Sequence, residues 1–248
     1  MIQQHKPLIR VTQIETFRRW FRQSEFDYEI PEQSVIDCIT QKFVGNDYTR
    51  IGTAFHSIVE TGQPYCVKVH AGIRTFMFRG KPVEEQVPCG RKFDIEGHEV
   101  TLDVPQCKVA LEYRAEHPQT FHEIREYMDF GDAVVTGCAD MIDGLEIRDI
   151  KTKYSVPNDK DYADSCQWRF YMQLFGADVF HFDLFIFDGY NPDKHGGDVR
   201  GLPLTRREPI TVYRYPGLEQ DNLNLLHEFL QWAEDRDLVK YLTNKSIS

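Results

Sequence analysis

The chain lacks the features that mark several classes of protein. Its six cysteines stand singly, at positions 38, 66, 89, 107, 138 and 166, so no CxxC pair indicates a zinc ribbon. No apolar run approaches the roughly 20 residues that a membrane span needs. The N-terminal stretch MIQQHKPLIRVTQIETF also lacks the apolar segment of a secretory signal. We therefore expect a cytoplasmic protein with free thiols and no membrane partner.

An excess of positive charge is absent as well. The formal net charge is -10, which on its own argues against a nucleic-acid binder. It does not exclude one, because the local field matters and a nuclease needs acidic metal ligands. Basic residues do cluster at Arg18, Arg19 and Arg22, and again at Arg206 and Arg207. Each cluster is equally well read as a solvated helix face or loop.

The periodicity of apolar residues divides the chain into predicted helices, strands and loops. Helical spacing predicts helices over 11–22, 31–43, 50–61, 161–176 and 217–242. Short segments rich in β-branched and aromatic residues predict strands over 65–71, 74–78, 98–104, 109–115, 120–128, 133–142, 145–152, 181–190 and 210–215. A loop rich in glycine, proline and charge is expected over 188–209.

This order of elements predicts the fold class. Helices, a run of strands, a helix, a strand and a last helix describe an α/β protein with a central mixed sheet flanked by helices. The 248 residues fit a single domain spanning 1–248. The N-terminal helices, within 1–62, are the candidates for a small subdomain.

The stretch GCADMIDGLEIRDIKTKY, residues 137–154, carries the most chemistry. Asp140 ends one predicted strand, Asp143-Gly144 turns the chain, and the next strand carries Asp149, Ile150 and Lys151. Alternation places Asp149 and Lys151 on one face and Ile150 in the core. Two carboxylates on neighbouring strands can hold Mg²⁺ or Mn²⁺, and a lysine beside them can orient an attacking water. The alternative is a surface hairpin with a cross-strand ion pair.

Three motifs resemble those of a known family. Asp140 with Asp149-Ile150-Lys151 resembles the D…(D/E)XK core of the PD-(D/E)XK nucleases, although Ala139 stands where the superfamily name has proline. The run from Gln167 to Tyr171 resembles the QxxxY motif of the RecB-like and lambda-exonuclease-like branches. The run from Gly52 to His56 resembles the GxxxH motif of RecB-like nucleases. The three motifs lie in the expected order and on the expected element types.

The resemblance implies a restriction-endonuclease-like core and a role for each matched residue. The implied metal ligands are His56, Asp140, Asp149 and the carbonyl of Ile150. The implied catalytic residues are Asp140, Asp149, Lys151, Gln167 and Tyr171. Lys151 would position or activate the water, and Gln167 and Tyr171, one helical turn apart, would contact Lys151 or a DNA phosphate. The alternatives are a hydrogen-bonded core histidine at position 56 and an ordinary helix surface at 167 and 171. The iron–sulfur cluster of many RecB-like helicase-nucleases is not expected, since no cysteine follows Cys166.

A further carboxylate follows from the expected pairing of strands. If the chain reverses near Gly131-Asp132, residues whose numbers sum to about 263 face each other, which places Glu123 opposite Asp140. Nucleases of this branch often carry an acidic residue on that strand. A register slip would favour Glu126 instead.

The function implied is metal-dependent cleavage of DNA, by an exonuclease of recombination or repair that a phage could encode. The alternatives are an endonuclease of the restriction or junction-resolving type, which generally lacks the QxxxY and GxxxH motifs, and a non-catalytic nucleic-acid-binding protein that keeps the fold. Polarity, strandedness, RNA activity and oligomeric state stay open, a ring-shaped homo-oligomer being an analogy with lambda exonuclease. Since the mean field repels DNA, we expect a local basic rim of Arg50, Lys151, Lys153 and Arg169, which Arg18, Arg19 and Arg22 of the first helix could extend.

Overall fold

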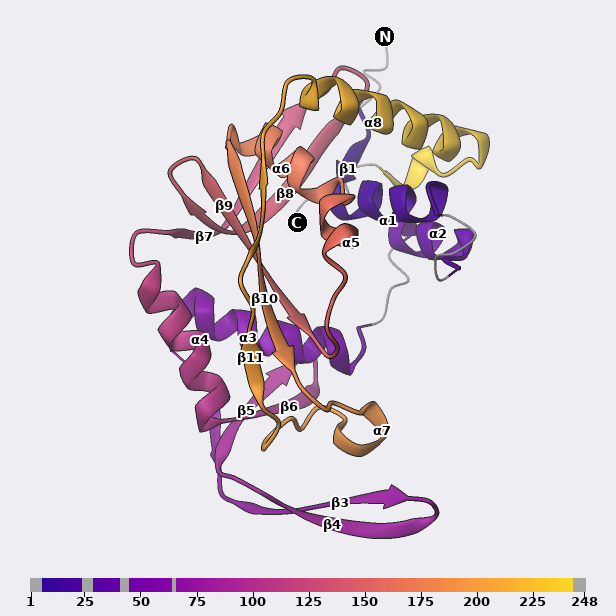
Figure 1. Cartoon of the computed structure of the whole chain (residues 1–248). Coiled ribbons are helices and arrows are strands. Elements are labelled where there is room, and N and C mark those ends of the chain that lie inside the picture. The colour runs from indigo at the N-terminus through magenta and orange to yellow at the C-terminus, as the bar shows by residue number, and fades with distance from the viewer. Residues whose placement is uncertain (1–5, 24–28, 41–44, 64–65, 243–248) are drawn as a thin grey trace.

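The computed structural model describes residues 6–23, 29–40, 45–63 and 66–242. Within them, a seven-stranded mixed sheet forms the centre of the molecule (Figure 1). Its strands are β1 (Leu8–Arg10), β7 (Phe121–Asp129), β8 (Val134–Asp143), β9 (Glu146–Lys153), β10 (Val179–Phe187), β11 (Leu204–Arg206) and β12 (Ile210–Tyr213).

The topology of this sheet confirms the predicted mixed arrangement. Strand β8 runs antiparallel to β7 and β9 and parallel to β1. Strand β9 runs parallel to β10, which in turn pairs antiparallel with β11 and β12. The parallel pairing of β9 with β10 requires a crossover, and residues 159–175 supply it as two short helices.

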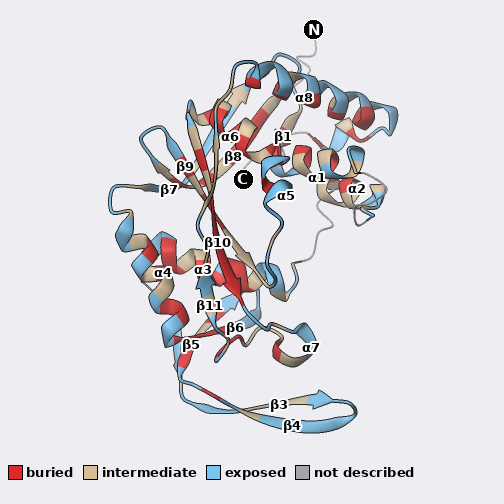
Figure 2. Ribbon diagram, in the orientation of Figure 1, coloured by how far each residue is buried: buried red, intermediate tan, exposed pale blue. Residues whose placement is uncertain are grey.

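Helices cover the sheet, and the buried apolar residues form two separate groups. Figure 2 marks the buried residues along the ribbon in red. The helices are α1 (Val11–Phe21), α2 (Glu32–Thr40), α3 (Asp47–Thr61), α4 (Val104–Glu116), α5 (Asp159–Ala163), α6 (Gln167–Phe175), α7 (Pro192–His195), α8 (Leu218–Asp235) and the 3-10 turn Val239–Tyr241. The first group lies among α1, α2, α6 and α8, and the second among α3, α4 and the small strands described next. The helices predicted within 1–62 therefore contribute to both groups.

Two smaller sheets extend the molecule beyond the second group. Strands β2 (Val67–Val69), β5 (Gly90–Ile95) and β6 (His98–Asp103) form one of them. Strands β3 (Gly72–Phe78) and β4 (Lys81–Val87) form the other, a hairpin that projects from the end of the molecule opposite α8 (Figure 1).

The prediction of a strand over 109–115 is wrong, because this segment lies in α4. The side chain of Asp103 accepts a hydrogen bond from the Gln106 amide at 2.9 Å, and the side chain of Gln106 accepts one from the Asp103 amide at 2.8 Å. This reciprocal cap, with Pro105 in the first turn, starts a helix. Ala110 and Tyr113 then face the second apolar group at helical spacing.

The single helix predicted over 161–176 is interrupted. Helix α5 ends at Ala163 and α6 begins at Gln167. The break has a tertiary cause, since the Cys166 amide donates to the Glu15 carboxylate of α1 at 2.8 Å. The predicted loop over 188–209 likewise contains α7 and β11. The end of the helix predicted over 31–43 and the start of the strand predicted over 65–71 lie outside the described residues.

Candidate active site

The hairpin of β8 and β9 opens into a fork where the predicted chemistry begins. The two strands pair only from Met141 to Asp143 against Glu146 to Arg148. Their two-residue turn has Gly144 at a φ of 57°, the left-handed conformation that glycine adopts without strain. Beyond this short ladder, the Asp140 carboxylate accepts a hydrogen bond from the Ile150 amide at 2.7 Å. The predicted hairpin is confirmed, and Asp140 bridges the point at which the strands separate.

Asp149 and Lys151 lie on one side of β9, as alternation predicts. The Lys151 ammonium is 2.7 Å from Oδ2 of Asp149. Ile150 between them is buried in the second apolar group. The other carboxylate oxygen of Asp149 accepts a hydrogen bond from the Gln167 side-chain amide at 2.8 Å. Asp149 is thus held from two sides, by the next residue but one on β9 and by the first turn of α6.

The charges of this pair are tuned by burial and by each other. Burial raises the pKa of Asp149 to about 6, with the nearby Asp140 adding to the effect and Lys151 opposing it. Burial works against the charged form of Lys151, but the carboxylates of Asp149 and Asp140 outweigh it and raise the pKa of this lysine. In the protein without metal, burial therefore destabilises the charged form of Asp149, whereas the neighbouring carboxylates stabilise the charged form of Lys151.

A cluster of possible metal ligands meets at the fork. One ligand atom each of His56, Glu123 and Asp140 lies within 4.8 Å of the other two. The imidazole Nδ1 of His56 is 3.7 Å from Oδ2 of Asp140. These residues come from α3, β7 and β8, so the tertiary fold gathers them.

The strand register explains why Glu123 reaches this cluster. Strands β7 and β8 pair with residue numbers that sum to 263, as in Ile124 with Ala139 and His122 with Met141. This confirms the register from which Glu123 was chosen. Glu123 itself has a φ of 51°, which is unfavourable for a residue with a side chain. Glu126 lies opposite Gly137, outside the cluster.

Two glycines let helices approach the fork closely. A Cβ atom added to Gly52 of α3 would lie 2.8 Å from Oγ1 of Thr152 on β9. A side chain at this position would require Thr152 to shift, so glycine lets α3 lie close to β9, and His56 follows one helical turn later. A Cβ atom on Gly137 would lie 2.5 Å from the ring of Tyr171. The sequence motifs marked Gly52, but nothing in the sequence pattern marked Gly137.

Helix α6 supports the fork rather than facing open solvent. The Tyr171 hydroxyl donates to the backbone carbonyl of Cys138 at 3.1 Å, and the residue is buried. Gln167 bonds to Asp149 as described. The expected contact of these two residues with Lys151 or a DNA phosphate stays a prediction, because the hydrogen bonds that the structure shows for them go to Asp149 and to the Cys138 carbonyl. Both residues hold the strands that carry Asp140 and Asp149.

The donor set fits a hard divalent cation. Carboxylates are the protein ligands that Mg²⁺ and Mn²⁺ prefer, and an imidazole is acceptable to Mn²⁺. Oδ2 of Asp149 is buried and is contacted by the Lys151 ammonium at 2.7 Å. The fit to a divalent cation therefore rests on the chemistry of the gathered carboxylates and imidazole. His56, Glu123, Asp140 and Asp149 are thus the residues that could hold the metal. The metal contact expected of the Ile150 carbonyl stays a prediction.

The predicted basic rim divides into residues that form ion pairs within the protein and residues near the fork. Arg18 pairs with Glu15 at 2.8 Å, Arg22 with Glu228 of α8 at 3.1 Å, and Arg169 with Asp221 of α8 at 3.9 Å. Arg50 pairs with Asp47 at 3.4 Å. It also precedes Gly52 by two positions, which turns it to the opposite side of α3 from Gly52 and His56. Each of these four arginines has an acidic partner within the protein, and their part in a DNA path stays a prediction.

Lys153 and Arg19 do lie by the fork. Burial lowers the pKa of Lys153, and the positive charges of Lys151 and Arg19 lower it further. These three cations therefore form one positive patch on the side of β9 that carries Asp149. Arg19 is exposed and has no ion-pair partner among the residues that the structure places. It is better positioned for a phosphate than Arg18 or Arg22.

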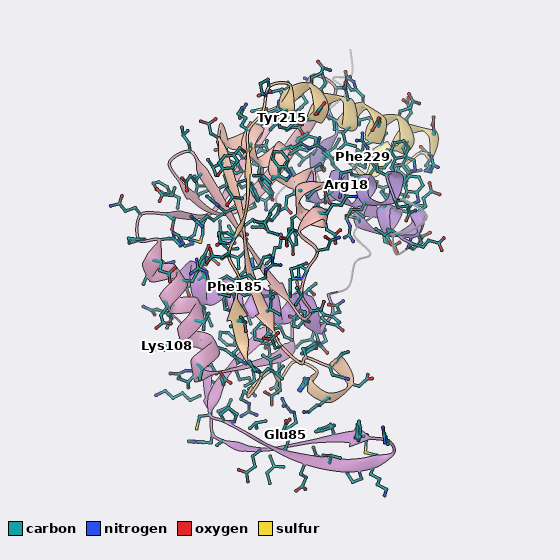
Figure 3. All side chains as sticks on the ribbon, viewed as in Figure 1. Arg18, Glu85, Lys108, Phe185, Tyr215 and Phe229 are labelled. Atoms are coloured by element: carbon teal, nitrogen blue, oxygen red, sulfur yellow. The ribbon has the colours of Figure 1, made fainter. Side chains whose placement is uncertain are left out.

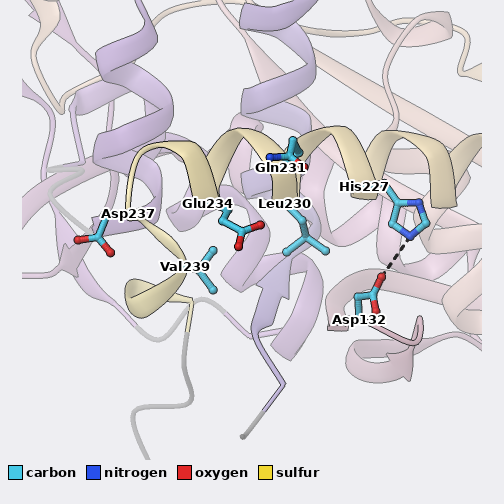
Figure 4. A pocket seen from close by; sticks show the side chains of 7 residues that line it. All are labelled: Asp132, His227, Leu230, Gln231, Glu234, Asp237 and Val239. Carbon is cyan, nitrogen blue, oxygen red and sulfur yellow. Dashed lines mark ion pairs between the residues drawn. The ribbon is translucent and has the colours of Figure 1, made fainter.

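A pocket of about 620 Å³ lies elsewhere, along α8 (Figure 4). It is lined by Asp132, His227, Leu230, Gln231, Glu234, Asp237 and Val239. His227 and Asp132 face each other across it, with Nε2 3.5 Å from Oδ2. None of the predicted site residues lines this pocket, so it does not compete with the fork as the catalytic centre.

Comparison with known proteins gives a family match over most of the chain. A model of the PD-(D/E)XK nuclease superfamily matches residues 12–236. No curated protein matches significantly. Among the described helices, none is long and apolar enough to cross a membrane.

Two solved structures show weaker similarity. The crystal structure of SSO0001 is 18% identical, with a TM-score of 0.33, and the match covers 50% of this chain and 55% of that one. This chain thus spans about half the length of SSO0001. A candidate exonuclease from Eubacterium rectale is 10% identical, with a TM-score of 0.46, and the match covers 96% of this chain and 83% of that one.

Proposed function

Because the chain belongs to the PD-(D/E)XK nuclease superfamily, we propose that it is a divalent-metal-dependent deoxyribonuclease whose centre is the fork of β8 and β9. The observation that carries this proposal is the meeting of His56, Glu123 and Asp140 beside the Asp149–Lys151 pair. Hydrolysis of nucleic acid follows from the family. The metal, the DNA substrate and the residue roles are our proposal.

Each residue at the fork has a role that its contacts support. Bound Mg²⁺ or Mn²⁺ lowers the pKa of an attacking water and stabilises the leaving oxygen. His56, Glu123, Asp140 and Asp149 would hold the cation. Lys151 has a partly exposed side chain, 31% of it accessible, so its ammonium can donate to the water or to a phosphate oxygen.

Gln167 and Tyr171 act as positioning residues. Gln167 fixes the rotamer of Asp149 through its 2.8 Å hydrogen bond. Tyr171 fixes the backbone at Cys138, two residues before Asp140. Partners that orient metal ligands in this way commonly affect activity by about 10–100-fold.

We further propose that the enzyme attacks DNA ends. The support is the GxxxH and QxxxY pair, whose glycine, histidine and glutamine all make contacts at the fork. End-labelled linear DNA and covalently closed circular DNA should be incubated with Mg²⁺ or Mn²⁺. We expect progressive shortening of linear DNA and no cleavage of the circle. Cleavage of the circle would favour the endonuclease alternative, and no cleavage of either with any divalent metal would contradict the nuclease assignment.

A further inference from the structure

The hairpin of β3 and β4, called the arm (residues 72–87), has no role in the fork. Figure 2 shows it as an almost entirely exposed ribbon. It carries several of the exposed large apolar residues of the described chain: Ile73, Met77, Phe78 and Val83. Apolar side chains gathered on a projecting element indicate an interaction surface.

The base of the arm is clamped to the body of the protein. Arg74 donates to the backbone carbonyl of Asp198 at 2.5 Å and to Glu85 at 2.6 Å. Lys194 bonds to Glu85 at 3.0 Å and lies over the ring of Phe76, 4.8 Å from its centre. An isolated two-stranded ribbon is marginally stable in water, so these contacts hold the arm in one direction.

The clamp connects the arm to the catalytic sheet. Lys194 and Asp198 follow β10 in the chain. Strand β10 pairs with the whole length of β9. Strand β9 carries Asp149 and Lys151. The direction of the arm is therefore set relative to the fork through one strand and one short segment.

The tip of the arm has a composition unlike that of the whole chain. Residues 77–82 read Met-Phe-Arg-Gly-Lys-Pro, with two cations and no acid, in a chain of net charge -10. The turn places Arg79 and Gly80 at φ values of 50° and 75°. The Arg79 guanidinium lies over the ring of Phe78, 5.3 Å from its centre. Phe78 is 56% exposed.

We propose that the tip of the arm is a nucleic-acid contact, in which Phe78 stacks on an unpaired base while Arg79 and Lys81 neutralise phosphates. An exposed aromatic ring between cations suits a single strand, since every base has a face to stack and every nucleotide a phosphate to neutralise. A second copy of the chain is a poorer occupant, because a tip of six residues is smaller than the roughly 800 Å² per partner of a stable interface. This inference rests on the proposed nuclease function and extends its DNA path beyond the fork.

The test compares two variants that change the net charge equally. Arg79→Gln/Lys81→Gln removes two positive charges at the tip. Lys108→Glu also shifts the charge by two, on α4, where Lys108 points away from the arm (Figure 3). Phe78→Ala tests stacking alone. The affinity for DNA with a single-stranded overhang is measured against salt with Ca²⁺ in place of Mg²⁺, followed by cleavage at saturating DNA with Mg²⁺ or Mn²⁺.

We expect Phe78→Ala to weaken binding by about tenfold. The double variant should reduce the log–log salt slope by about two, at about 0.9 per lost contact on duplex DNA and less on single strands. Lys108→Glu should change neither the DNA affinity nor the salt slope. All three variants should cleave at the wild-type rate when DNA is saturating. Equal affinity and slope in the tip variants and the wild type would overturn the proposal, as would a change in oligomeric state without a change in affinity. Wild type that binds DNA through the tip but never cleaves it would contradict the nuclease function and leave the arm contact standing.

Discussion

The fork and the arm differ in how they present their proposed functional side chains, which are buried at the fork and exposed at the arm. At the fork, Asp149 is buried, bonded to Gln167 and paired with Lys151. At the arm, Phe78 is exposed, and its ring lies beneath the guanidinium of the neighbouring Arg79. Burial fixes the orientation of a side chain and shifts its pKa, whereas exposure leaves a side chain accessible to a binding partner. Changes at the fork should therefore alter chemistry, and changes at the tip should alter binding alone.

The largest effect is expected from the fork. Lys151→Ala or Asp149→Ala should abolish metal-dependent DNA cleavage, because a positioned proton donor alone contributes about 10²–10⁴-fold and the metal contributes more. The matched control is Lys108→Ala, which removes an exposed lysine of α4 whose ion-pair partner is Glu112, outside the fork. Single-turnover cleavage at saturating DNA, with the fold checked by circular dichroism, measures this. Full activity in either fork variant would disprove the assignment.

A smaller effect is expected at Gln167, which contacts the proposed metal ligand Asp149. Gln167→Ala removes the hydrogen bond to Asp149 and should lower metal affinity or activity by about 10–100-fold. The exposed Gln231 of α8, changed to alanine, is the control. Activity measured against Mn²⁺ concentration separates the effects, since a positioning role predicts partial rescue at high metal. A loss equal to that of Asp149→Ala, with no rescue, would show that Gln167 acts on the substrate directly.

The fork was predictable from sequence because most of it is local. Asp140, Asp149 and Lys151 lie on one hairpin with a two-residue turn, and Glu123 lies on the adjacent hairpin, whose register follows from its turn. Strand alternation then fixes which residues share a face. His56 required the family resemblance, because no local rule brings α3 to β8.

The partners of the arginines were not predicted, for two different reasons. The pairing of Arg18 with Glu15 is a spacing of three on a helix and could have been read from the sequence. The pairings of Arg22 and Arg169 with α8 depend on how distant helices pack. The same limit applies to α5 and α6, whose break depends on Glu15 of α1.

A change at Asp149 that abolishes activity should at the same time stabilise the fold of the metal-free protein. The pKa of Asp149 is raised from 3.8 to about 6, so this carboxyl stabilises the metal-free protein below pH about 4 and loses that contribution as pH rises through about 6. Asp149→Asn should therefore raise the melting temperature of the metal-free protein at pH 7 by a few degrees and leave it nearly unchanged at pH 4. Mn²⁺ should stabilise the wild type and not the variant. A lower melting temperature for the variant at pH 7 would show that the ion pair with Lys151 outweighs the cost of burial.

The smallest effect is expected at the arm, where the contrast with the fork is sharpest. Met77 is 63% exposed, and its side chain points to the face of the arm that bears Ile73 rather than Arg74, because strand residues alternate. Met77→Ser should thus change the free energy of unfolding by no more than about 0.5 kcal/mol. By comparison, Phe185, fully buried on β10 in the second apolar group, should cost about 3–5 kcal/mol when changed to alanine. Urea unfolding of both variants measures the difference. A loss of several kcal/mol for Met77→Ser would mean that the arm is covered in solution, by a second copy or by the rest of the chain, and a melting temperature that rises with protein concentration would identify the second copy.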